Sequence, residues 1–320
     1  MKLGITIMAF FSLNLLATEQ LFTHSHTVTK RIAISFDDAP TPASSYFSGP
    51  ERTSLLLESL AKAGIQQTAF FAVSQHITPE GQQRLLAYSN AGHIIANHTH
   101  SHPNLNGTSL SHFIADIEQA DSVLQHYPTF RKWFRFPYLR EGDTLKKRDG
   151  VRQYLADNDY INAYITLNNY DWYLDKLFQQ AIQAGESIDL TAMRSFYVET
   201  LLESIHYYDK LALQYLNRSP DHVLLLHEND LAALFISDLI AELQLQGWEI
   251  ILMEQAYQDP LLNYQTSRLL TFNPGRIGEI AADNGQKKGL WHTTLNEAYL
   301  KERFTDKVLQ QAIRQESATE

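Results

Sequence analysis

The stretch Asn97-His98-Thr99-His100-Ser101-His102-Pro103 follows the apolar run His93-Ile94-Ile95-Ala96, which predicts a short buried strand. His98 and His102 stand four residues apart. If the chain turned helically after the strand, this spacing would place both imidazoles on one face, and two such imidazoles are a common half of a zinc site. His100 lies between them and should point elsewhere. Because 13 histidines occur in 320 residues, the pair alone does not distinguish a metal site from chance clustering in a polar loop.

A third metal ligand is offered by a stretch some sixty residues earlier. The run Arg31-Ile32-Ala33-Ile34-Ser35-Phe36-Asp37-Asp38-Ala39-Pro40 predicts a buried strand that ends in two carboxylates. Adjacent side chains of a strand point in opposite directions, so Asp37 and Asp38 should not share one role. One could bind a metal while the other handles protons. The alternative is an ordinary Asx-type turn before Pro40.

Five stretches, taken in order, resemble the five motifs of the polysaccharide deacetylases (the NodB-homology domain, carbohydrate esterase family four). They are Ser35-Phe36-Asp37-Asp38-Ala39-Pro40, Asn97-His98-Thr99-His100-Ser101-His102, Arg135-Phe136-Pro137-Tyr138, Asp171-Trp172 and Leu225-Leu226-His227. The resemblance covers roughly residues 30–256, and the ordered set is far more specific than any single motif. Two positions depart from the family pattern. Ala39 replaces a usual glycine, and Asn168-Asn169 stands where another acidic residue is usual.

The resemblance implies a metal-dependent hydrolytic site. In this reading, Asp38, His98 and His102 bind one divalent ion, with Zn²⁺ expected and Co²⁺, Ni²⁺ or Mn²⁺ as alternatives. A water activated by the metal is the nucleophile, and Asp37 is the base that takes its proton. His227 is the acid that protonates the leaving amine or alcohol.

The resemblance also implies supporting residues around that site. Arg135 is expected to orient the base, with Asp171 holding this arginine, and a simple salt bridge at the barrel rim is the alternative reading of the pair. The backbone N–H of Tyr138 is expected to stabilise the oxyanion. Trp172 and Leu225 are expected to line a pocket for the acetyl methyl group, although both could be ordinary core residues.

The N-terminus predicts export. It begins Met1-Lys2, continues without a charge to Ala17, and is too short and too polar to span a bilayer comfortably. This pattern is typical of a secretory signal peptide over residues 1–17, followed by a polar linker over 18–29. A buried N-terminal helix is the alternative. We therefore expect a periplasmic or extracellular protein without stable membrane insertion.

The composition constrains stability and partners. There is no cysteine, so an exported chain would depend on a large core rather than on disulfides. The formal net charge is −10, which argues against a nucleic-acid partner. An acidic balance says little about a neutral glycan.

Apolar strands alternate with amphipathic helices, which predicts a parallel α/β architecture with motif residues at the strand ends. The resemblance implies an irregular (β/α)7 barrel over residues 30–256, with a helical insertion at about 173–216. Residues 257–320 form a C-terminal extension expected to pack on the barrel, with a turn at Phe272-Asn273-Pro274-Gly275. The expected strands are 31–40, 68–73, 93–96, 132–138, 160–167, 222–227 and 248–253.

The expected function is that of a secreted metal-dependent deacetylase acting on N-acetyl or O-acetyl groups of a glycan. One alternative is a C–N hydrolase of the same fold acting on a small cyclic amide or ureide, but such metabolism is usually cytosolic. The other is a catalytically inactive glycan-binding protein, and the presence of Asp37 and His227 argues against it. The polymer and the oligomeric state are left open.

Overall fold

The computed structural model describes residues 29–309. The predicted signal peptide and nearly all of the predicted linker lie outside the described residues. Within them, seven parallel strands form one sheet in the order β5-β4-β3-β2-β1-β6, with β7 also paired to β1. Their bounds are β1 Lys30–Ala39, β2 Ala69–Ala72, β3 Ile94–Asn97, β4 Phe130–Phe134, β5 Ile161–Asn162, β6 Asp221–His227 and β7 Trp248–Ile250.

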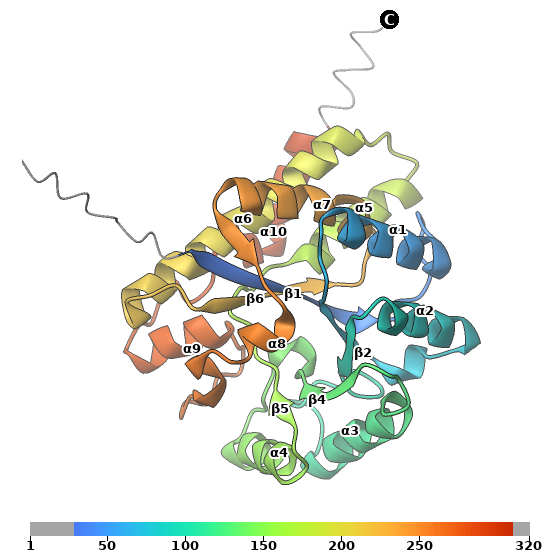
Figure 1. The fold of residues 1–320 in the computed structure, drawn as a ribbon. Coiled ribbons are helices and arrows are strands. Elements are labelled where there is room, and N and C mark those ends of the chain that lie inside the picture. The colour runs from blue at the N-terminus through green and yellow to red at the C-terminus, as the bar shows by residue number, and fades with distance from the viewer. Residues whose placement is uncertain (1–28, 310–320) are drawn as a thin grey trace, which may run out of the picture.

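Strand β1 is the strand that pairs with three others, β2, β6 and β7 (Figure 1). One edge pairs with β6 from Arg31 to Asp37, and the other edge is shared by β7 near its start and β2 near its end. Its interior residues Ile32, Ala33, Ile34 and Phe36 are all buried. Both faces of this sheet are covered, which explains why the strands are continuous apolar runs rather than alternating ones.

The segment after β5 curls the sheet back on itself. The predicted strand 160–167 pairs with β4 only at Ile161–Asn162, and its far end forms a parallel bridge from Leu167 to Leu224 of β6. The N–H of Leu167 donates to the carbonyl of Val223 at 3.1 Å, and the N–H of Leu225 donates to the carbonyl of Leu167 at 3.2 Å. The two ends of the sheet are therefore joined, and the predicted irregular α/β barrel is confirmed.

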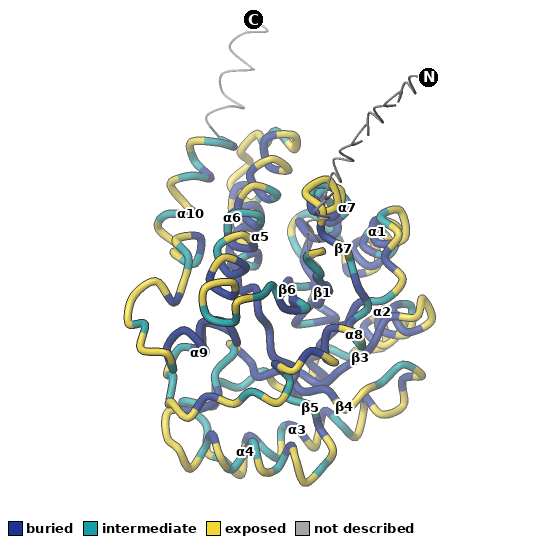
Figure 2. Tube along the Cα trace, turned by 60° about the vertical axis from the view of Figure 1, so that its left-hand side comes forward, coloured by how far each residue is buried: buried dark blue, intermediate teal, exposed yellow. Residues whose placement is uncertain are grey.

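Helices surround the sheet, with buried faces turned inward and exposed faces outward (Figures 1 and 2). The α-helices are α1 Gly49–Lys62, α2 Pro79–Asn90, α3 Leu110–Leu124, α4 Leu145–Asp157, α5 Asp171–Gln183, α6 Leu190–Leu216, α7 Asp230–Leu245, α8 Met253–Ala256, α9 Arg276–Asp283 and α10 Glu297–Phe304. Short 3₁₀ turns are η1 Ser74–His76, η2 Pro137–Leu139, η3 Pro260–Asn263 and η4 Thr293–Leu295, and a π-helical turn, η5, covers Thr305–Leu309.

Local sequence explains where several helices begin. Ser48 Oγ accepts a hydrogen bond from the N–H of Glu51, and the Glu51 carboxylate accepts one from the N–H of Ser48. This capping box satisfies two helix-end donors of α1. Thr78 caps α2 by accepting from the N–H of Gly81, and Pro79 occupies the first helical position.

Helix α6 and the C-terminal segment pack together on one side of the barrel. Helix α6 contacts α7 and α9, and α10 contacts α5. Figure 2 shows α10 beside α5 and α6. Ile277, Leu300 and Phe304 lie in the same apolar core as the barrel strands. Residues 257–309 are therefore part of the packed body.

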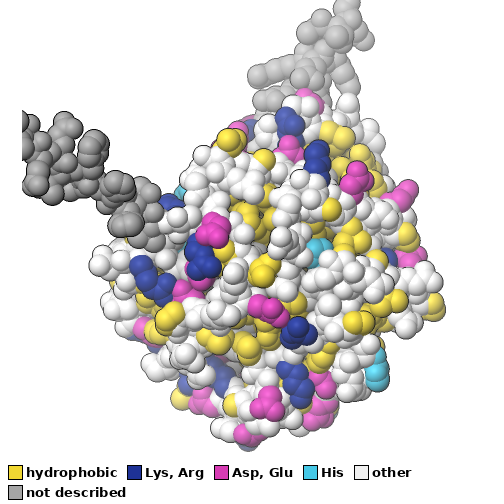
Figure 3. Space-filling model, in the orientation of Figure 1, with side chains coloured by type: hydrophobic (Ala, Val, Ile, Leu, Met, Phe, Trp, Pro, Cys, Tyr) yellow, Lys and Arg dark blue, Asp and Glu magenta, His cyan; other side chains and the backbone are white. Residues whose placement is uncertain are grey.

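The described surface carries charges of both signs. On the face drawn in Figure 3, Lys and Arg side chains lie interspersed with Asp and Glu. Among the described helices, none has the length and apolar character needed to cross a membrane.

Candidate active site

The residues with chemistry stand where parallel strands end. Asp37 and Asp38 lie near the end of β1, His98 follows β3, Arg135 follows β4, and His227 is the last residue of β6. Carboxyl ends of parallel strands open onto one edge of a barrel, so residues distant in sequence meet there.

Asp38, His98 and His102 form a three-ligand cluster. Asp38 Oδ1 lies 3.5 Å from His98 Nε2 and 3.3 Å from His102 Nε2. The three ligand atoms all lie within 4.8 Å of one another. Asp38 Oδ1 is buried and has no hydrogen-bond partner. A buried carboxylate oxygen left without a donor, facing two imidazole nitrogens, fits a divalent metal ion of the zinc type.

The surroundings of His98 and His102 favour their neutral, unprotonated forms. His98 Nδ1 lies 2.8 Å from the backbone oxygen of Arg135, which places the proton on Nδ1 and leaves Nε2 to face Asp38. Burial, with a further contribution from His102, lowers the pKa of His98 to about 3. Burial also lowers the pKa of His102. Unprotonated imidazoles are what a metal requires.

The predicted helical turn between the two histidines is wrong. Thr99 and His102 have positive φ angles of 72° and 55°, so the chain makes a tight irregular turn. Asn97 Oδ1 accepts from the N–H of Thr99 at 2.8 Å, and Thr99 Oγ1 accepts from the N–H of His102 at 3.0 Å. These side chains replace helical hydrogen bonds. His100 points elsewhere, as predicted, with its Nδ1 2.9 Å from Ser74 Oγ.

Asp37 has a different environment from Asp38, although its Oδ2 also lies near the cluster, 3.7 Å from His98 Nε2. It is 3% exposed, and its Oδ1 accepts from Arg135 Nη1 at 2.7 Å. Burial raises the pKa of Asp37 to about 6, although the Arg135 guanidinium acts to lower it. A carboxyl group with that pKa can exchange a proton near neutral pH.

Arg135 is fixed from several directions. It donates to Ser35 Oγ at 2.8 Å, to the carbonyl of Ala163 at 3.0 Å and to Tyr257 Oη at 3.2 Å. Its guanidinium lies 3.9 Å from the ring centroid of Phe71. The arginine therefore presents one fixed nitrogen to Asp37.

Asp171 does not hold Arg135, which corrects the sequence-based expectation. Its Oδ1 lies 2.7 Å from His227 Nδ1, and its Oδ2 accepts from the backbone N–H of His227 at 2.8 Å. The bridge from Leu167 to β6 explains the difference, because it brings the start of α5 to the end of β6. Arg135 follows β4 and faces Asp37 instead.

The Asp171 carboxylate determines the protonation of His227. Burial acts to lower the pKa of His227, but the charge and hydrogen bond of Asp171 outweigh it and raise that pKa to about 9. Asn169 positions the carboxylate, because its side chain donates to the carbonyl of Leu225 at 2.5 Å and accepts from the N–H of Asp171 at 2.9 Å.

These groups open into a cleft of about 460 Å³, called the catalytic cleft below. It contains eight of the ten residues predicted from the sequence: Asp37, Asp38, His98, His102, Tyr138, Trp172, Leu225 and His227. The other two, Arg135 and Asp171, contact Asp37 and His227. Tyr138 has a φ of 56°, is 56% exposed and packs its ring against His102 with centroids 4.5 Å apart.

The sequence reasoning missed part of the wall of this cleft. The additional residues are Leu139, Arg140, Asn168, Asn169, Tyr170, Phe272 and Asn273. Phe272 and Asn273 come from the C-terminal segment, at the turn that the Asn-Pro-Gly sequence indicates. Gly275 completes that turn with a φ of 87°. The local sequence predicts the turn, but nothing in it indicates that the turn lies at the catalytic cleft.

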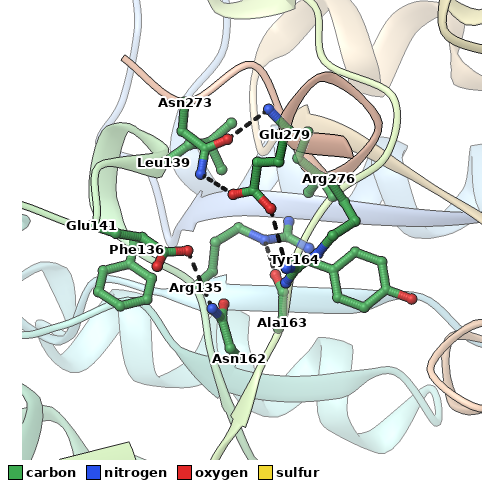
Figure 4. A pocket seen from close by; sticks show the side chains of 12 residues that line it. Arg135, Phe136, Leu139, Glu141, Asn162, Ala163, Tyr164, Asn273, Arg276 and Glu279 are labelled. Atoms are coloured by element: carbon green, nitrogen blue, oxygen red, sulfur yellow. Dashed lines mark hydrogen bonds and ion pairs between the residues drawn. The ribbon is translucent and has the colours of Figure 1, made fainter. Parts of the chain in front are cut away.

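A small polar cavity lies behind Arg135 (Figure 4). Its volume is about 20 Å³, roughly that of one water molecule. Figure 4 shows Glu279 between Asn273, which donates to it at 2.7 Å, and Arg276, which lies 3.1 Å from it. Arg276 also lies over the ring of Tyr164, 4.7 Å from its centroid. The C-terminal segment is thus tied to the barrel beside Arg135.

The Asp37–Arg135 and His227–Asp171 pairs, beside a cluster of two histidines and one aspartate at the strand ends of a parallel α/β barrel, form an arrangement suited to hydrolysis. Residues 24–155 match the family model described as polysaccharide deacetylase. The resemblance to this family that the sequence motifs indicate is thereby confirmed for these residues.

Known proteins similar to this chain include a curated relative and several solved structures. A peptidoglycan-N-acetylglucosamine deacetylase of Bacillus cereus is 25% identical over 144 residues, which are 44% of this chain and 46% of that protein. The match thus spans about half the length of the curated relative. The peptidoglycan deacetylase PdaC from Bacillus subtilis is 19% identical, with 72% of this chain and 91% of that chain covered and a TM-score of 0.48.

Two further solved structures differ in what their descriptions state. A family 4 carbohydrate esterase from Streptomyces lividans in complex with acetate is 17% identical, with 71% of this chain and 95% of that chain covered and a TM-score of 0.48. A family pseudoenzyme from Bacillus anthracis is 15% identical, with coverage of 72% and 66% and a TM-score of 0.49.

Proposed function

We propose that this protein is a metal-dependent deacetylase that hydrolyses N-acetyl, or O-acetyl, groups of a glycan. One observation carries the proposal. The Asp37–Arg135 pair and the His227–Asp171 pair flank the cluster of three potential metal ligands within one open cleft. The description of the matching family model and the name of the curated relative support an acetylated glycan as the substrate.

The metal would be held by Asp38, His98 and His102, with Zn²⁺ as the expected ion and Co²⁺, Ni²⁺ or Mn²⁺ as alternatives. Three protein ligands leave a position open, which is the arrangement of catalytic zinc sites. When bound, the ion supplies Lewis acidity, which polarises the carbonyl and lowers the pKa of water.

Asp37 is the proposed base. It takes a proton from the water that attacks the acetyl carbonyl carbon, and Arg135 keeps the carboxylate oriented toward the cleft. Its raised pKa of about 6 makes it a stronger base than an exposed aspartate and still leaves it ionised at neutral pH.

His227 is the proposed acid. As the carbon–nitrogen or carbon–oxygen bond breaks, His227 donates a proton to the departing amine or alcohol, and acetate is the second product. Its pKa of about 9 keeps the imidazole protonated at neutral pH. Asp171 holds the ring and compensates its charge.

Binding roles are proposed for three residues in the catalytic cleft. The backbone N–H of Tyr138 would donate to the developing oxyanion. Trp172 and Leu225 would contact the acetyl methyl group, because both are apolar and line the same cleft as Asp37 and His227.

The alternatives receive less support from the site. An inactive glycan-binding protein would not need a base with a raised pKa and an acid with a carboxylate partner. A hydrolase of small cyclic amides would use the same groups. A glycan substrate is favoured over a small cyclic amide by the catalytic cleft, because its residues come from several loops and include the exposed Tyr138.

The remaining proposals concern the chain as a whole. Residues 1–17 are proposed as a signal peptide, 18–29 as a linker, 30–256 as the deacetylase domain and 257–320 as its extension. Export to the periplasm or medium can be checked by expressing the full chain in a Gram-negative host and sequencing the N-terminus. Met1 retained on a cytoplasmic product would contradict export.

The function is tested by measuring acetate release from chitin oligomers, peptidoglycan, an acetylated exopolysaccharide and acetylxylan. We expect release from at least one glycan, its loss with a chelator and its recovery with Zn²⁺. The His98→Ala variant should not bind the ion and should not release acetate. The control variant His100→Ala should bind the ion and release acetate. Acetate release that persists in chelator and in His98→Ala would refute the metal-dependent mechanism.

A further inference from the structure

A second cleft, of about 650 Å³, lies next to the catalytic cleft. Tyr170 and Phe272 line both, so the two clefts are contiguous. The rest of its aromatic wall is Trp291 and Tyr299, with Thr293 and Asn296 among the polar groups. Apart from Tyr170, these residues belong to the C-terminal segment, beyond residues 24–155 that match the family model.

Aromatic rings form the connection between the clefts. The Phe272 and Trp291 rings have centroids 5.4 Å apart and are tilted by 57°, and Tyr170 and Trp172 have centroids 5.1 Å apart. The Trp291 side chain is 38% exposed. Trp172 lies in the catalytic cleft, so a row of rings leads from there into the second cleft.

The loop that carries Phe272 is held in place. Arg140 Nη1 and Asn106 Nδ2 both donate to the carbonyl of Thr271, at 2.6 and 3.1 Å. The Arg140 guanidinium also lies 5.4 Å from the centroid of the Phe272 ring. The shared wall between the clefts is therefore fixed by two residues of the barrel loops.

The chemistry of the second cleft suits a neutral, hydroxyl-rich ligand. None of its lining residues is a lysine, arginine, aspartate or glutamate. Its one titratable imidazole, His292, has a pKa lowered by burial and is neutral. Sugar rings offer polarised C–H groups to the negative faces of aromatic rings, while their hydroxyls bond to amide and hydroxyl side chains at the edges.

We propose that the second cleft binds the sugar units that neighbour the one being deacetylated. The inference rests on the proposed deacetylase function. It assigns to Trp291, Phe272 and Tyr299 the recognition of a glycan chain several units long. The C-terminal segment thereby sets a substrate length requirement for this protein.

Kinetics on substrates of different length test the proposal. The probes are N-acetylglucosamine oligomers of two to six units, with acetate release measured for wild type, Trp291→Ala and the control Leu245→Ala. Leu245 is 81% exposed at the end of α7, away from the residues of both clefts. We expect kcat/KM of Trp291→Ala to fall about tenfold on the six-unit chain, the value of one aromatic contact, and to stay unchanged on the two-unit chain. Leu245→Ala should match wild type on both.

Calorimetric binding separates this proposal from the proposed function. In an Asp37→Asn background, the six-unit oligomer should bind about tenfold more weakly after Trp291→Ala, and Trp291→Phe should retain part of the affinity. Thermal unfolding checks that each variant is folded.

The outcomes distinguish the two proposals. Trp291-dependent binding without acetate release from any glycan would support glycan binding by the second cleft and refute the deacetylase function. Acetate release that Trp291→Ala leaves unchanged, or lowers equally on two-unit and six-unit chains, would refute the proposal that the second cleft binds neighbouring sugar units. Failure of every oligomer to bind would also overturn it.

Discussion

At the scale of the residue, the two adjacent carboxylates of β1 are assigned opposite tasks by their surroundings. Asp38 has a φ of 69°, which directs its side chain toward His98 and His102. Burial acts to raise the pKa of Asp38, but the neighbouring His227, His102 and His98 lower it below the ordinary value. Asp37 faces Arg135, whose Nη1 donates to its Oδ1. One carboxylate therefore stays ionised, whereas the other can exchange a proton.

This difference predicts that replacing each aspartate by asparagine impairs a different property, metal affinity for Asp38 and turnover for Asp37. Asp38→Asn should lose metal affinity, because a neutral amide is a poorer ligand than a carboxylate. Asp37→Asn should keep its metal while kcat falls by roughly 10²–10⁴-fold, the usual contribution of a positioned base. Elemental analysis and acetate-release kinetics measure both effects. Near-normal turnover of Asp37→Asn would show that another group takes the proton.

The pH dependence of activity belongs to the same scale. Asp37 must be ionised and His227 protonated, so activity should rise through about pH 6 and decline through about pH 9. The Asp171 carboxylate favours the charged imidazole, so Asp171→Asn lowers the pKa of His227. The alkaline limb of kcat should then move down by roughly 1–3 pH units, while the acidic limb stays in place. An unmoved alkaline limb would exclude His227 as the acid that is paired to Asp171.

At the scale of the element, three segments converge on Arg135. Strand β1 contributes Ser35 and Asp37, the segment after β5 contributes Ala163, and the end of α8 contributes Tyr257. Tyr257 Oη accepts from Arg135 and donates to the carbonyl of Tyr164 at 3.1 Å, which joins two of these segments. The position of Asp37, the proposed base, therefore depends on the end of α8, outside the five sequence motifs.

Tyr257→Phe tests this dependence. The substitution leaves a buried guanidinium nitrogen and a carbonyl without their partner, which should lower the free energy of unfolding by about 1–3 kcal/mol. We expect kcat to decrease and metal content to be unchanged. Urea unfolding and acetate release are the measurements.

Tyr197→Phe is the matched control, since the Tyr197 hydroxyl is buried on α6 without a hydrogen-bond partner. Its removal should be neutral or stabilising. If both phenylalanine variants behaved alike, the hydrogen bonds of Tyr257 would have no role in holding Arg135.

At the scale of the whole molecule, the site exists only in the folded chain. Asp38 and His98 are sixty residues apart in sequence, and the parallel pairing of β1, β2 and β3 brings their strand ends together. An ion that binds the folded chain and not the unfolded chain stabilises it by mass action. The chain contains no cysteine, so bound metal is the expected external source of stability.

We therefore expect the melting temperature of chelator-treated protein to rise when Zn²⁺ is added. At a hundredfold excess over Kd the stabilisation is about 2.7 kcal/mol, which corresponds to several degrees for a chain of this size. Scanning calorimetry across a Zn²⁺ series measures it. His98→Ala should abolish the shift, and His100→Ala should retain it because His100 faces Ser74. An equal shift in both variants would place the metal elsewhere.

Much of this architecture is determined by the sequence alone. Largely apolar runs of four to ten residues predicted the parallel strands, because strands buried on both faces read as continuous apolar runs. The ordered motifs predicted eight of the residues that line the catalytic cleft, since catalytic groups of such barrels lie at strand ends. The turn at 272–275 followed from its Asn-Pro-Gly chemistry.

Only the tertiary structure decided which of these groups meet. The pairing of Asp171 with His227 depends on the bridge from Leu167 to β6, a contact between backbones that leaves no local pattern. The turn from His98 to His102 depends on side-chain hydrogen bonds that compete with a helix. The placement of Phe272 beside Tyr170 depends on how the C-terminal segment packs. Local propensity acts over a few residues, whereas these contacts join segments that are far apart in the chain, so only the folded core determines them.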